Sequence, residues 1–110
     1  MKVKEFIGRE GKLQIEQAIK EAELDTSGEI RVHIESKCTS DPLQRAVYIF
    51  NYLKMYNTQA RNGVLIYVAV ESRKFAIIGD AGILSGRIRE KIAHIRYILQ
   101  IIRNLKTHTL

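Results

Sequence analysis

Two carboxylates and an amide, Glu29, Asn62 and Asp80, are the residues whose types and positions best predict a chemical role. Hydroxyl groups and a guanidinium lie close to them in the sequence, at Thr26, Ser27, Thr58 and Arg61. Calcium takes about six to eight oxygen ligands, and these side chains together with backbone carbonyls supply part of such a set. The pattern is therefore compatible with a site in which Glu29, Asn62 and Asp80 hold calcium or another divalent cation.

The same residues also permit a purely structural interpretation, which spacing alone favours. Glu29 then caps or forms an ion pair at a strand start, with Arg61 as its partner, and Asp80 shapes the turn at 79–82. That turn is not a phosphate loop, because no Gly-Lys-Ser or Gly-Lys-Thr follows it.

Three segments have the sequence pattern of strands. Glu29–Glu35 alternates strictly, which predicts one buried face. Val64–Val70 is continuously apolar and rich in β-branched residues, which predicts a central strand covered on both faces. Phe75–Gly79 follows a short polar turn, and a turn this short permits only a hairpin.

Three other segments have helical periodicity. Apolar residues recur at helical spacing over Gly11–Leu24. Ser40-Asp41-Pro42 predicts the start of a second helix, because a capping side chain precedes a proline in the first turn, and an apolar stripe continues to Met55. Ser85–Leu105 is predicted as one long helix.

The order of these elements is α-β-α-β-β-α. The helix between the first two strands predicts that they are parallel, and the hairpin makes the third antiparallel. We therefore expect an α/β fold, a small three-layer α/β/α sandwich around a mixed sheet. In that arrangement the starts of the first two strands and the end of the third share one edge. Glu29, Asn62 and Asp80 then lie on one rim.

Composition describes an ordinary globular chain of 110 residues, which is one domain in length. Apolar residues make up 45% and charged residues 27%. The longest apolar run, Val64–Val70, is too short to span a membrane. The N-terminus has no apolar core of a secretory signal, and the single cysteine, Cys38, suits a reducing compartment. These features predict a cytoplasmic protein without membrane insertion.

The basic charge is concentrated near the C-terminus. Of the net charge of +6, residues 83–110 contribute +5 and residues 1–82 contribute +1. A uniformly basic domain would favour nucleic acid as a partner, whereas a basic terminal helix is weaker evidence for it. Binding of nucleic acid or an anionic membrane through the tail rests on charge alone, and we expect no nucleic-acid partner.

The predicted C-terminal helix has a wide apolar stripe, which includes Ile88, Ile92, Ile95, Leu99 and Ile102. Ile98, Ile101 and Leu105 widen it beyond one narrow face. We expect the helix to dock on the domain as far as about Ile95 and its second half to form a homo-oligomer, or to be poorly ordered if it stays alone. Arg89, Arg96 and Arg103 recur every seven residues and are expected to face water.

Other residues with chemical potential have simpler roles. His33 lies on the polar face of a predicted strand, and it forms a poor catalytic couple with Cys38. His94 and His108 lack the spacing of a zinc site. Tyrosines recur every four residues on the second predicted helix, and we expect them to pack on the sheet. They are Tyr48, Tyr52 and Tyr56.

Four stretches of the sequence resemble the TPM domain family. They are Ala18-Ile19-Lys20-Glu21-Ala22-Glu23, Thr26-Ser27-Gly28-Glu29-Ile30, Arg61-Asn62-Gly63-Val64-Leu65-Ile66-Tyr67 and Gly79-Asp80-Ala81-Gly82-Ile83. The likeness predicts a TPM-like α/β domain over residues 1–83. Residues 84–110, the basic amphipathic C-terminal helix, depart from the family pattern. The chain is similar to a short cytoplasmic bacterial subgroup without a signal peptide or transmembrane segment.

The resemblance implies a compact α/β/α sandwich and two kinds of function. The first is a weak metal-dependent phosphatase or calcium-binding module. In an enzyme, Glu29 and Asp80 would hold the ion, Arg61 would steady the phosphate of a phosphorylated small molecule, and Asp80 and Arg61 would be its catalytic residues. The second is a non-catalytic interaction domain, which fits the lack of a recognisable nucleophile–base pair in the sequence.

Overall fold

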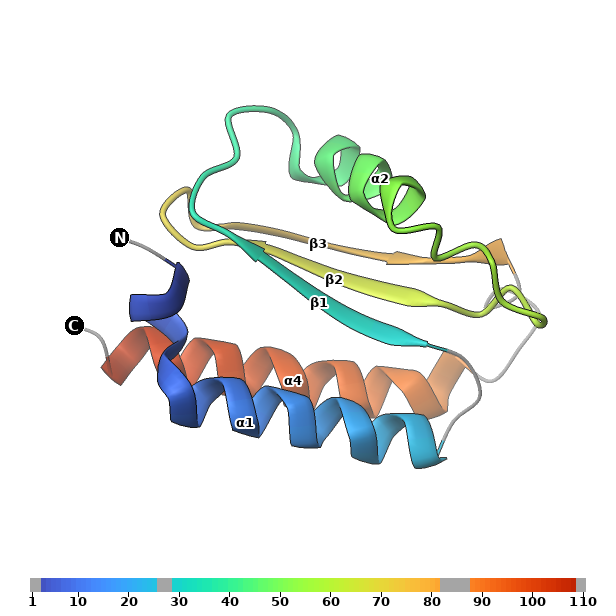
Figure 1. Ribbon diagram of the computed structural model, residues 1–110, viewed down its shortest axis with the longest axis horizontal. Coiled ribbons are helices and arrows are strands. Elements are labelled where there is room, and N and C mark those ends of the chain that lie inside the picture. Colours follow the sequence, from blue (N-terminus) through green and yellow to red (C-terminus); the bar gives the residue numbers. More distant parts are fainter. Residues whose placement is uncertain (1–2, 26–28, 82–87, 109–110) are drawn as a thin grey trace.

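The computed structural model describes residues 3–25, 29–81 and 88–108. Along the chain lie α1 (Val3–Asp25), β1 (Ile30–Glu35), α2 (Pro42–Tyr52), β2 (Val64–Ala69), β3 (Lys74–Gly79) and α4 (Ile88–His108). Figure 1 shows α2 on one side of the sheet and α1 with α4 on the other. The predicted order and the three-layer sandwich are confirmed.

The sheet has the predicted mixed topology, in the order β1-β2-β3. β1 is parallel to β2, with Ile30 opposite Val64, and β2 is antiparallel to β3, with Val64 opposite Gly79. The beginnings of β1 and β2 and the end of β3 therefore meet at one edge.

Both faces of β2 are covered, which explains its unbroken apolar sequence. All six of its residues are buried. Ile66 and Val68 face α1 and α4, whereas Leu65 and Tyr67 face α2. β1 and β3 are the sheet edges, and exposure alternates along β3. In β1 the burial does not alternate clearly: Ile30 is buried, and Val32 and Ile34 are partly buried against the core between the sheet, α1 and α4.

The first helix is longer than predicted and contains a kink. Gly8 has φ 66° and ψ 173°, values that only glycine adopts readily, so the turns before it change direction. The apolar residues on which the prediction rested lie after the kink, where Ile15, Ala18 and Ala22 are buried against the sheet and α4. The periodic pattern therefore marked the packed part of the helix.

The prediction that the second half of the C-terminal helix is left without a place on the domain is wrong. Ile98, Ile101 and Ile102 are at most 8% exposed. They pack in one cluster with Ile15 and Ala18 of α1, so α4 contacts a neighbouring helix as well as the sheet. That second contact is why the stripe is wide. Self-association through this helix stays a prediction.

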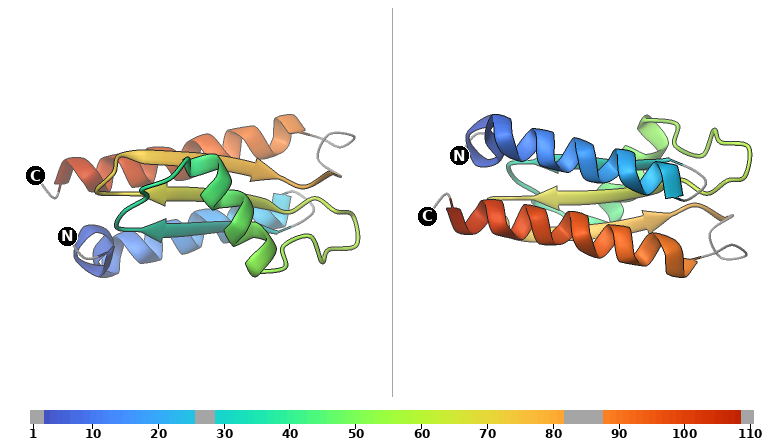
Figure 2. Two further views of the ribbon diagram at one scale, coloured as in Figure 1. Left: turned by 90° about the horizontal axis from the view of Figure 1, so that it is seen from above. Right: turned by 90° about the horizontal axis from the view of Figure 1, so that it is seen from below.

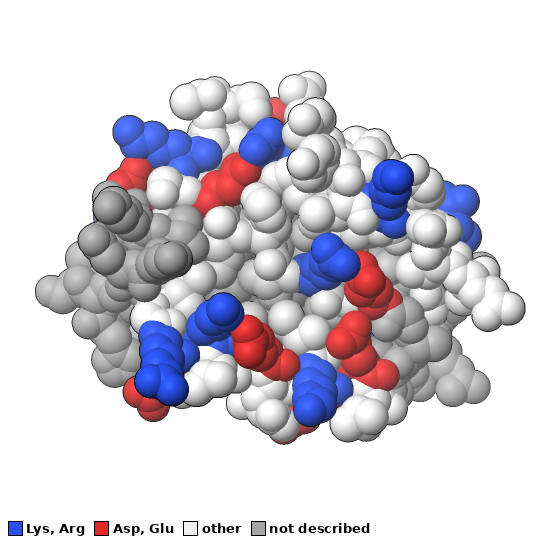
Figure 3. Space-filling model, viewed as in Figure 1, with Lys and Arg blue, Asp and Glu red and all other residues white. Residues whose placement is uncertain are grey.

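The expected solvent side of α4 agrees where side chains are described. Arg96 and Arg103 are exposed, and the side chain of Arg89 lies outside the described part. Residues 85–87, predicted as the start of the helix, also lie outside it. Figure 3 shows basic and acidic side chains lying side by side on the face that it displays.

The tyrosines of α2 do not pack on the sheet as predicted. Tyr48 and Tyr52 are 58% and 74% exposed and stack on each other, with ring centroids 6.2 Å apart. Ala46, Ile49 and Phe50 occupy the sheet-facing stripe instead. Because the tyrosines lie about one residue away from that stripe, they turn toward solvent. Tyr56 lies beyond the end of the helix and is 41% exposed.

The start of α2 agrees with the sequence. The carboxylate of Asp41 accepts a hydrogen bond from the Leu43 N–H at 2.9 Å, and Pro42 is the first helical residue. No helix in the described part of the chain is long and apolar enough to cross a membrane.

Candidate functional site

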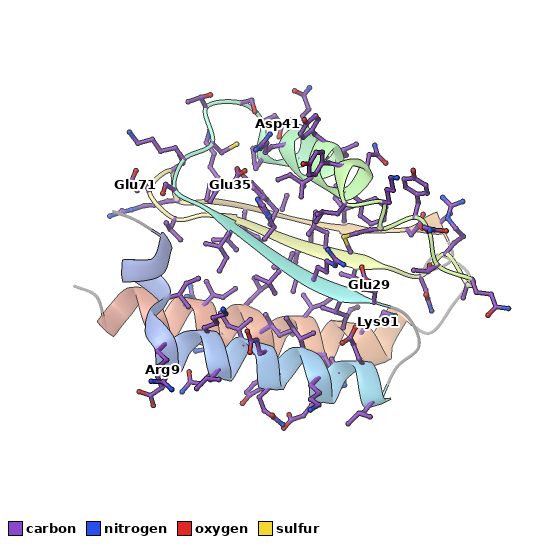
Figure 4. All side chains as sticks on the ribbon, in the orientation of Figure 1. Arg9, Glu29, Glu35, Asp41, Glu71 and Lys91 are labelled. Atoms are coloured by element: carbon purple, nitrogen blue, oxygen red, sulfur yellow. The ribbon has the colours of Figure 1, made fainter. Side chains whose placement is uncertain are left out.

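The rim at the shared edge of the sheet is held together by backbone hydrogen bonds. The Val64 N–H donates to the Glu29 carbonyl at 2.8 Å, and the Asp80 N–H donates to the Gly63 carbonyl at 2.9 Å. Segments that are far apart in the sequence are thereby fixed next to one another. Figure 4 shows Glu29 and Lys91 near this end of the sheet and Glu35 at the other.

Asp80 is the most firmly placed carboxylate of the rim. Its oxygens accept two hydrogen bonds from Arg61, from Nε at 2.8 Å and from Nη2 at 3.1 Å. One of them also accepts from the Ala81 N–H at 2.8 Å. The side chain of Asp80 is 7% exposed and that of Arg61 is 54% exposed. The hydrogen bonds from Arg61 lower the pKa of Asp80 and outweigh the opposing effect of burial.

Arg61 reaches Asp80 from an unusual backbone conformation. Its φ is 52°, in the left-handed region that disfavours residues other than glycine. The backbone N–H of the next residue, Asn62, donates to Thr58 Oγ1 at 3.3 Å, which closes the loop before β2. This loop therefore aims the guanidinium at the rim at a cost in local strain.

A buried lysine belongs to the rim and was missed from the sequence. Lys91 Nζ donates to the backbone carbonyl of Asn62 at 3.2 Å, and both residues are 6% exposed. The signal was present, because Lys91 stands four residues before Ile95 and seven before Ile98, on the buried stripe of α4. A charged residue in line with a buried stripe indicates a buried polar contact.

Glu29 lies at the strand start, as the structural interpretation predicted, but its partner differs. Its carboxylate pairs with Arg31 Nε at 3.0 Å and is 36% exposed, whereas Arg61 pairs with Asp80. Arg31 lies in β1, two residues after Glu29, which directly precedes the strand, so the two side chains lie on the same side of the extended chain. The named partner Arg61 was therefore wrong, and the role of an ion pair at a strand start was right.

The rim offers oxygen ligands of the kind that hard cations prefer. Asp80 and Glu29 carry carboxylate oxygens, and Asn62 carries a neutral amide oxygen. Both Asp80 oxygens accept hydrogen bonds from Arg61, so a cation would have to exchange with that guanidinium. In 3–25, 29–81 and 88–108 no three His, Cys, Asp or Glu side chains form a metal cluster. Thr26 and Ser27 lie outside those residues.

A second polar network, at the other end of the sheet, was not anticipated. Glu35 Oε2 accepts from Tyr67 Oη at 2.6 Å and from Arg45 Nε at 3.2 Å, and His33 Nε2 lies 3.2 Å from Oε1. The hydrogen bonds from Arg45, more than those from Tyr67 and His33, lower the pKa of Glu35 to about 2. Burial and the contact with Glu35 raise the pKa of Tyr67. These partners come from β1, α2 and β2, so spacing could not reveal them.

Cys38 lies beside this network. Burial raises the pKa of its thiol, but contacts with Tyr67 and Ser40 and the charge of Lys74 outweigh burial and lower it. Its Sγ donates to the Ser40 carbonyl at 3.3 Å. His33 is directed instead to Glu35 and stacks on the Tyr67 ring. Cys38 and His33 therefore have separate contacts.

Comparisons with known proteins identify relatives of the whole chain. The family model of the TPM domain matches residues 2–105, which extends well into α4. The NMR structure of BA42 protein from the psychrophilic bacterium Bizionia argentinensis is similar, with 35% sequence identity and a TM-score of 0.73. That alignment covers 99% of this chain and 87% of the other. A search of curated proteins gives no match.

Proposed function

The chain belongs to the TPM domain family, and from that membership and the geometry of the rim we propose that the protein is a module for calcium or another divalent cation, whose ligands are Asp80, Glu29 and Asn62. The observation that carries the proposal is the carboxylate of Asp80. It is nearly buried at the rim, yet the cation that neutralises it belongs to an exposed side chain, Arg61.

Arg61 supports the proposal because it can leave Asp80 at little cost. A buried carboxylate needs a compensating positive charge, and the Arg61 guanidinium supplies it in the absence of a metal ion. More than half of the Arg61 side chain is in contact with water. Exchange of the guanidinium for a divalent cation would therefore keep Asp80 neutralised while Arg61 became hydrated.

After the exchange, the released guanidinium of Arg61 is available to bind a substrate. A guanidinium forms two parallel hydrogen bonds to a phosphate, so Arg61 could steady the phosphate of a phosphorylated small molecule. A bound divalent cation polarises a phosphoryl oxygen and activates water. Asp80 and Arg61 would then be the catalytic residues of a weak phosphatase, with Asp80 holding the ion and Arg61 orienting the substrate.

A non-catalytic interaction domain is the second candidate, and the exposed face of α2 favours it. Leu43, Val47, Tyr48 and Tyr52 are each between 46% and 74% exposed on this helix. Aromatic residues on a helix face are typical of protein interfaces. In this case the protein would act by binding another protein through α2, and the rim would have no catalytic role.

Calcium titration of the full chain, followed by NMR, tests the proposal. We expect the amides of Glu29, Asn62 and Asp80 to shift with saturating behaviour at millimolar calcium or below, and Asp80→Asn to abolish the shifts. Asp41→Asn is the matched control, because this carboxylate caps α2 and asparagine caps equally well. Amides that stay still in the wild type, or shifts that survive in Asp80→Asn, would refute the cation site.

Phosphatase activity needs a separate assay on a panel of phosphomonoesters with and without calcium. Turnover that depends on the cation and disappears in Asp80→Asn and Arg61→Gln supports the enzyme. Saturable cation binding with no turnover on any substrate assigns the rim to a calcium-binding module alone.

A further inference from the structure

A groove lies at the end of the sheet opposite to the rim. The end of β2, the start of β3 and the second half of α4 bound it, and its volume is about 600 Å³. Figure 2 shows the two helices on this face of the sheet: α1 runs along the β1 side and α4 along the β3 side. Concave sites of this size hold small organic molecules. Glu29, Asn62 and Asp80 are not among the described residues that line it.

The floor of the groove is apolar. Val68 and Val70 are each 9% exposed there, and Ile102 is 6% exposed. Leu99 packs partly against the same core, and Phe75 is 60% exposed at the wall. Water gains little from contact with a concave apolar floor and an exposed phenyl ring. A hydrocarbon chain in the groove would remove both surfaces from water.

Basic side chains border the groove. Four of the described lining residues carry positive charge, and no described one is acidic. Lys74 is engaged elsewhere, because its Nζ donates to the carbonyls of Cys38 and Ser40, at 3.2 Å each. Arg73 and Arg96 are exposed and form no ion pair with a carboxylate in the described part of the chain. Two arginines therefore line an apolar groove and have no ion-pair partner among the described residues.

We propose that this groove binds a single-chain amphiphilic anion, an alkyl carboxylate. The hydrocarbon tail lies on Phe75 and Leu99, and Arg96 with Arg73 binds the carboxylate. A guanidinium pairs with a carboxylate through two parallel hydrogen bonds, and the apolar floor shields that pair from water. A second copy of the chain fits less well, because it would bring the arginines of both copies together.

Titration of the ¹⁵N-labelled full chain with sodium decanoate, below the concentration at which decanoate forms micelles, tests the proposal. We expect saturable shifts at the amides of Val70, Phe75 and Leu99. Acetate carries the same head group without a tail, and decyltrimethylammonium carries the same tail with the opposite charge. Both should bind at least about tenfold more weakly, because each loses one half of the contacts. Shifts spread evenly over the surface, or equal binding of decyltrimethylammonium, would overturn the proposal.

Two pairs of variants distinguish binding in the groove from non-specific binding of decanoate to any positive charge or exposed aromatic ring. Arg96→Gln is compared with Lys12→Gln, which removes the same charge from the exposed surface of α1. Phe75→Gln is compared with Tyr97→Gln, because Tyr97 is 55% exposed on the flank of α4 that faces α1. All four side chains are exposed, so each variant should fold.

We expect the two groove variants to weaken decanoate binding about three- to tenfold and the two controls to leave it unchanged. Controls that weaken binding as much as the groove variants would refute a specific site. So would groove variants that leave the Kd unchanged.

An anionic lipid bilayer also presents negative head groups and hydrocarbon chains, and an experiment with vesicles distinguishes binding to a bilayer from binding to a free anion. The groove is concave and of small volume, which suits one chain rather than a flat lipid surface. Phosphatidylglycerol vesicles replace decanoate in a sedimentation assay. No binding to vesicles together with binding of monomeric decanoate supports the proposal. Binding to vesicles without binding of monomeric decanoate overturns it.

Discussion

Two arginine–carboxylate pairs lie at opposite ends of one sheet, and they differ in how many groups share each carboxylate. Glu35 is bound by Arg45, by the hydroxyl of Tyr67 and by His33, and its side chain is 19% exposed. Among the described residues, Asp80 accepts from one side chain, Arg61, and from the Ala81 N–H. The side chain of Arg61 is 54% exposed, whereas that of Arg45 is 38% exposed.

This difference separates a structural pair from an exchangeable one. Release of Glu35 would remove the carboxylate that accepts from the hydroxyl of Tyr67, and Tyr67 is fully buried. Transfer of Asp80 from Arg61 to a divalent cation frees only a guanidinium that water already reaches. A carboxylate that is bonded to a buried group such as the Tyr67 hydroxyl holds elements together, and one whose side-chain partner is exposed can accept a new cation.

The largest expected effect is loss of stability on breaking the Glu35 network. Glu35→Ala removes the acceptor shared by Arg45 and the buried Tyr67 hydroxyl, and we expect a loss of about 2–4 kcal/mol in the free energy of unfolding. Glu29→Ala is the control, because its exposed pair with Arg31 should contribute within about 0.5 kcal/mol. Urea unfolding measures both. Equal losses in the two variants would contradict the comparison.

Acid should weaken the same network. The pKa of Glu35 is lowered from 4.5 to about 2 in the folded protein, so the folded state favours the ionised form. The resulting stability is complete above about pH 4.5 and is lost as the pH falls toward 2, with a total of about 3 kcal/mol at most.

Glu35→Gln isolates this contribution from those of other carboxylates. The difference in unfolding free energy between the wild type and this variant should shrink as the pH is lowered from 5 to 2, measured by urea unfolding at fixed ionic strength. A difference that is constant over this range would show that Glu35 titrates normally.

A smaller effect on stability is expected at the rim. Asp80→Asn keeps the shape of the side chain and its contact with the Ala81 N–H but removes the charge that Arg61 neutralises. Thermal unfolding should show a decrease in Tm that is less than half of that caused by Glu35→Ala. A larger decrease than in Glu35→Ala would make Asp80 the structural carboxylate and would reverse the comparison.

Most of the fold could be predicted from the sequence because each element has a local signal. Val64–Ala69 is apolar throughout since helices cover both faces of β2, and the Asp41–Pro42 pair marks a helix start. The second half of α4 could not be placed in this way. Its wide stripe fits a helix that contacts two neighbours as well as one that binds another chain, and only tertiary structure decides between them.

The site could be predicted in its positions but not in its contacts. Strand order alone brings Glu29, Asn62 and Asp80 to one edge. Which carboxylate receives Arg61 depends on the left-handed backbone conformation of that residue, and sequence spacing does not encode it. The Glu35 network is assembled from β1, α2 and β2 at once, so it has no pattern along the chain.

The mixed sheet also has a consequence for the order in which the protein folds. Residues 70–73 join β2 to β3, whereas residues 36–63 separate β1 from β2. Closing the shorter loop costs less chain entropy, so we expect the β2–β3 hairpin to be formed already in the folding transition state. The pairing of β1 with β2 should form after it. Stopped-flow kinetics check this: Ile78→Ala in β3 should mainly slow folding, and Val32→Ala in β1 should mainly speed unfolding. In a partly unfolded molecule, the end of the β2–β3 hairpin beside the groove should then stay folded longer than the parallel pair of β1 and β2.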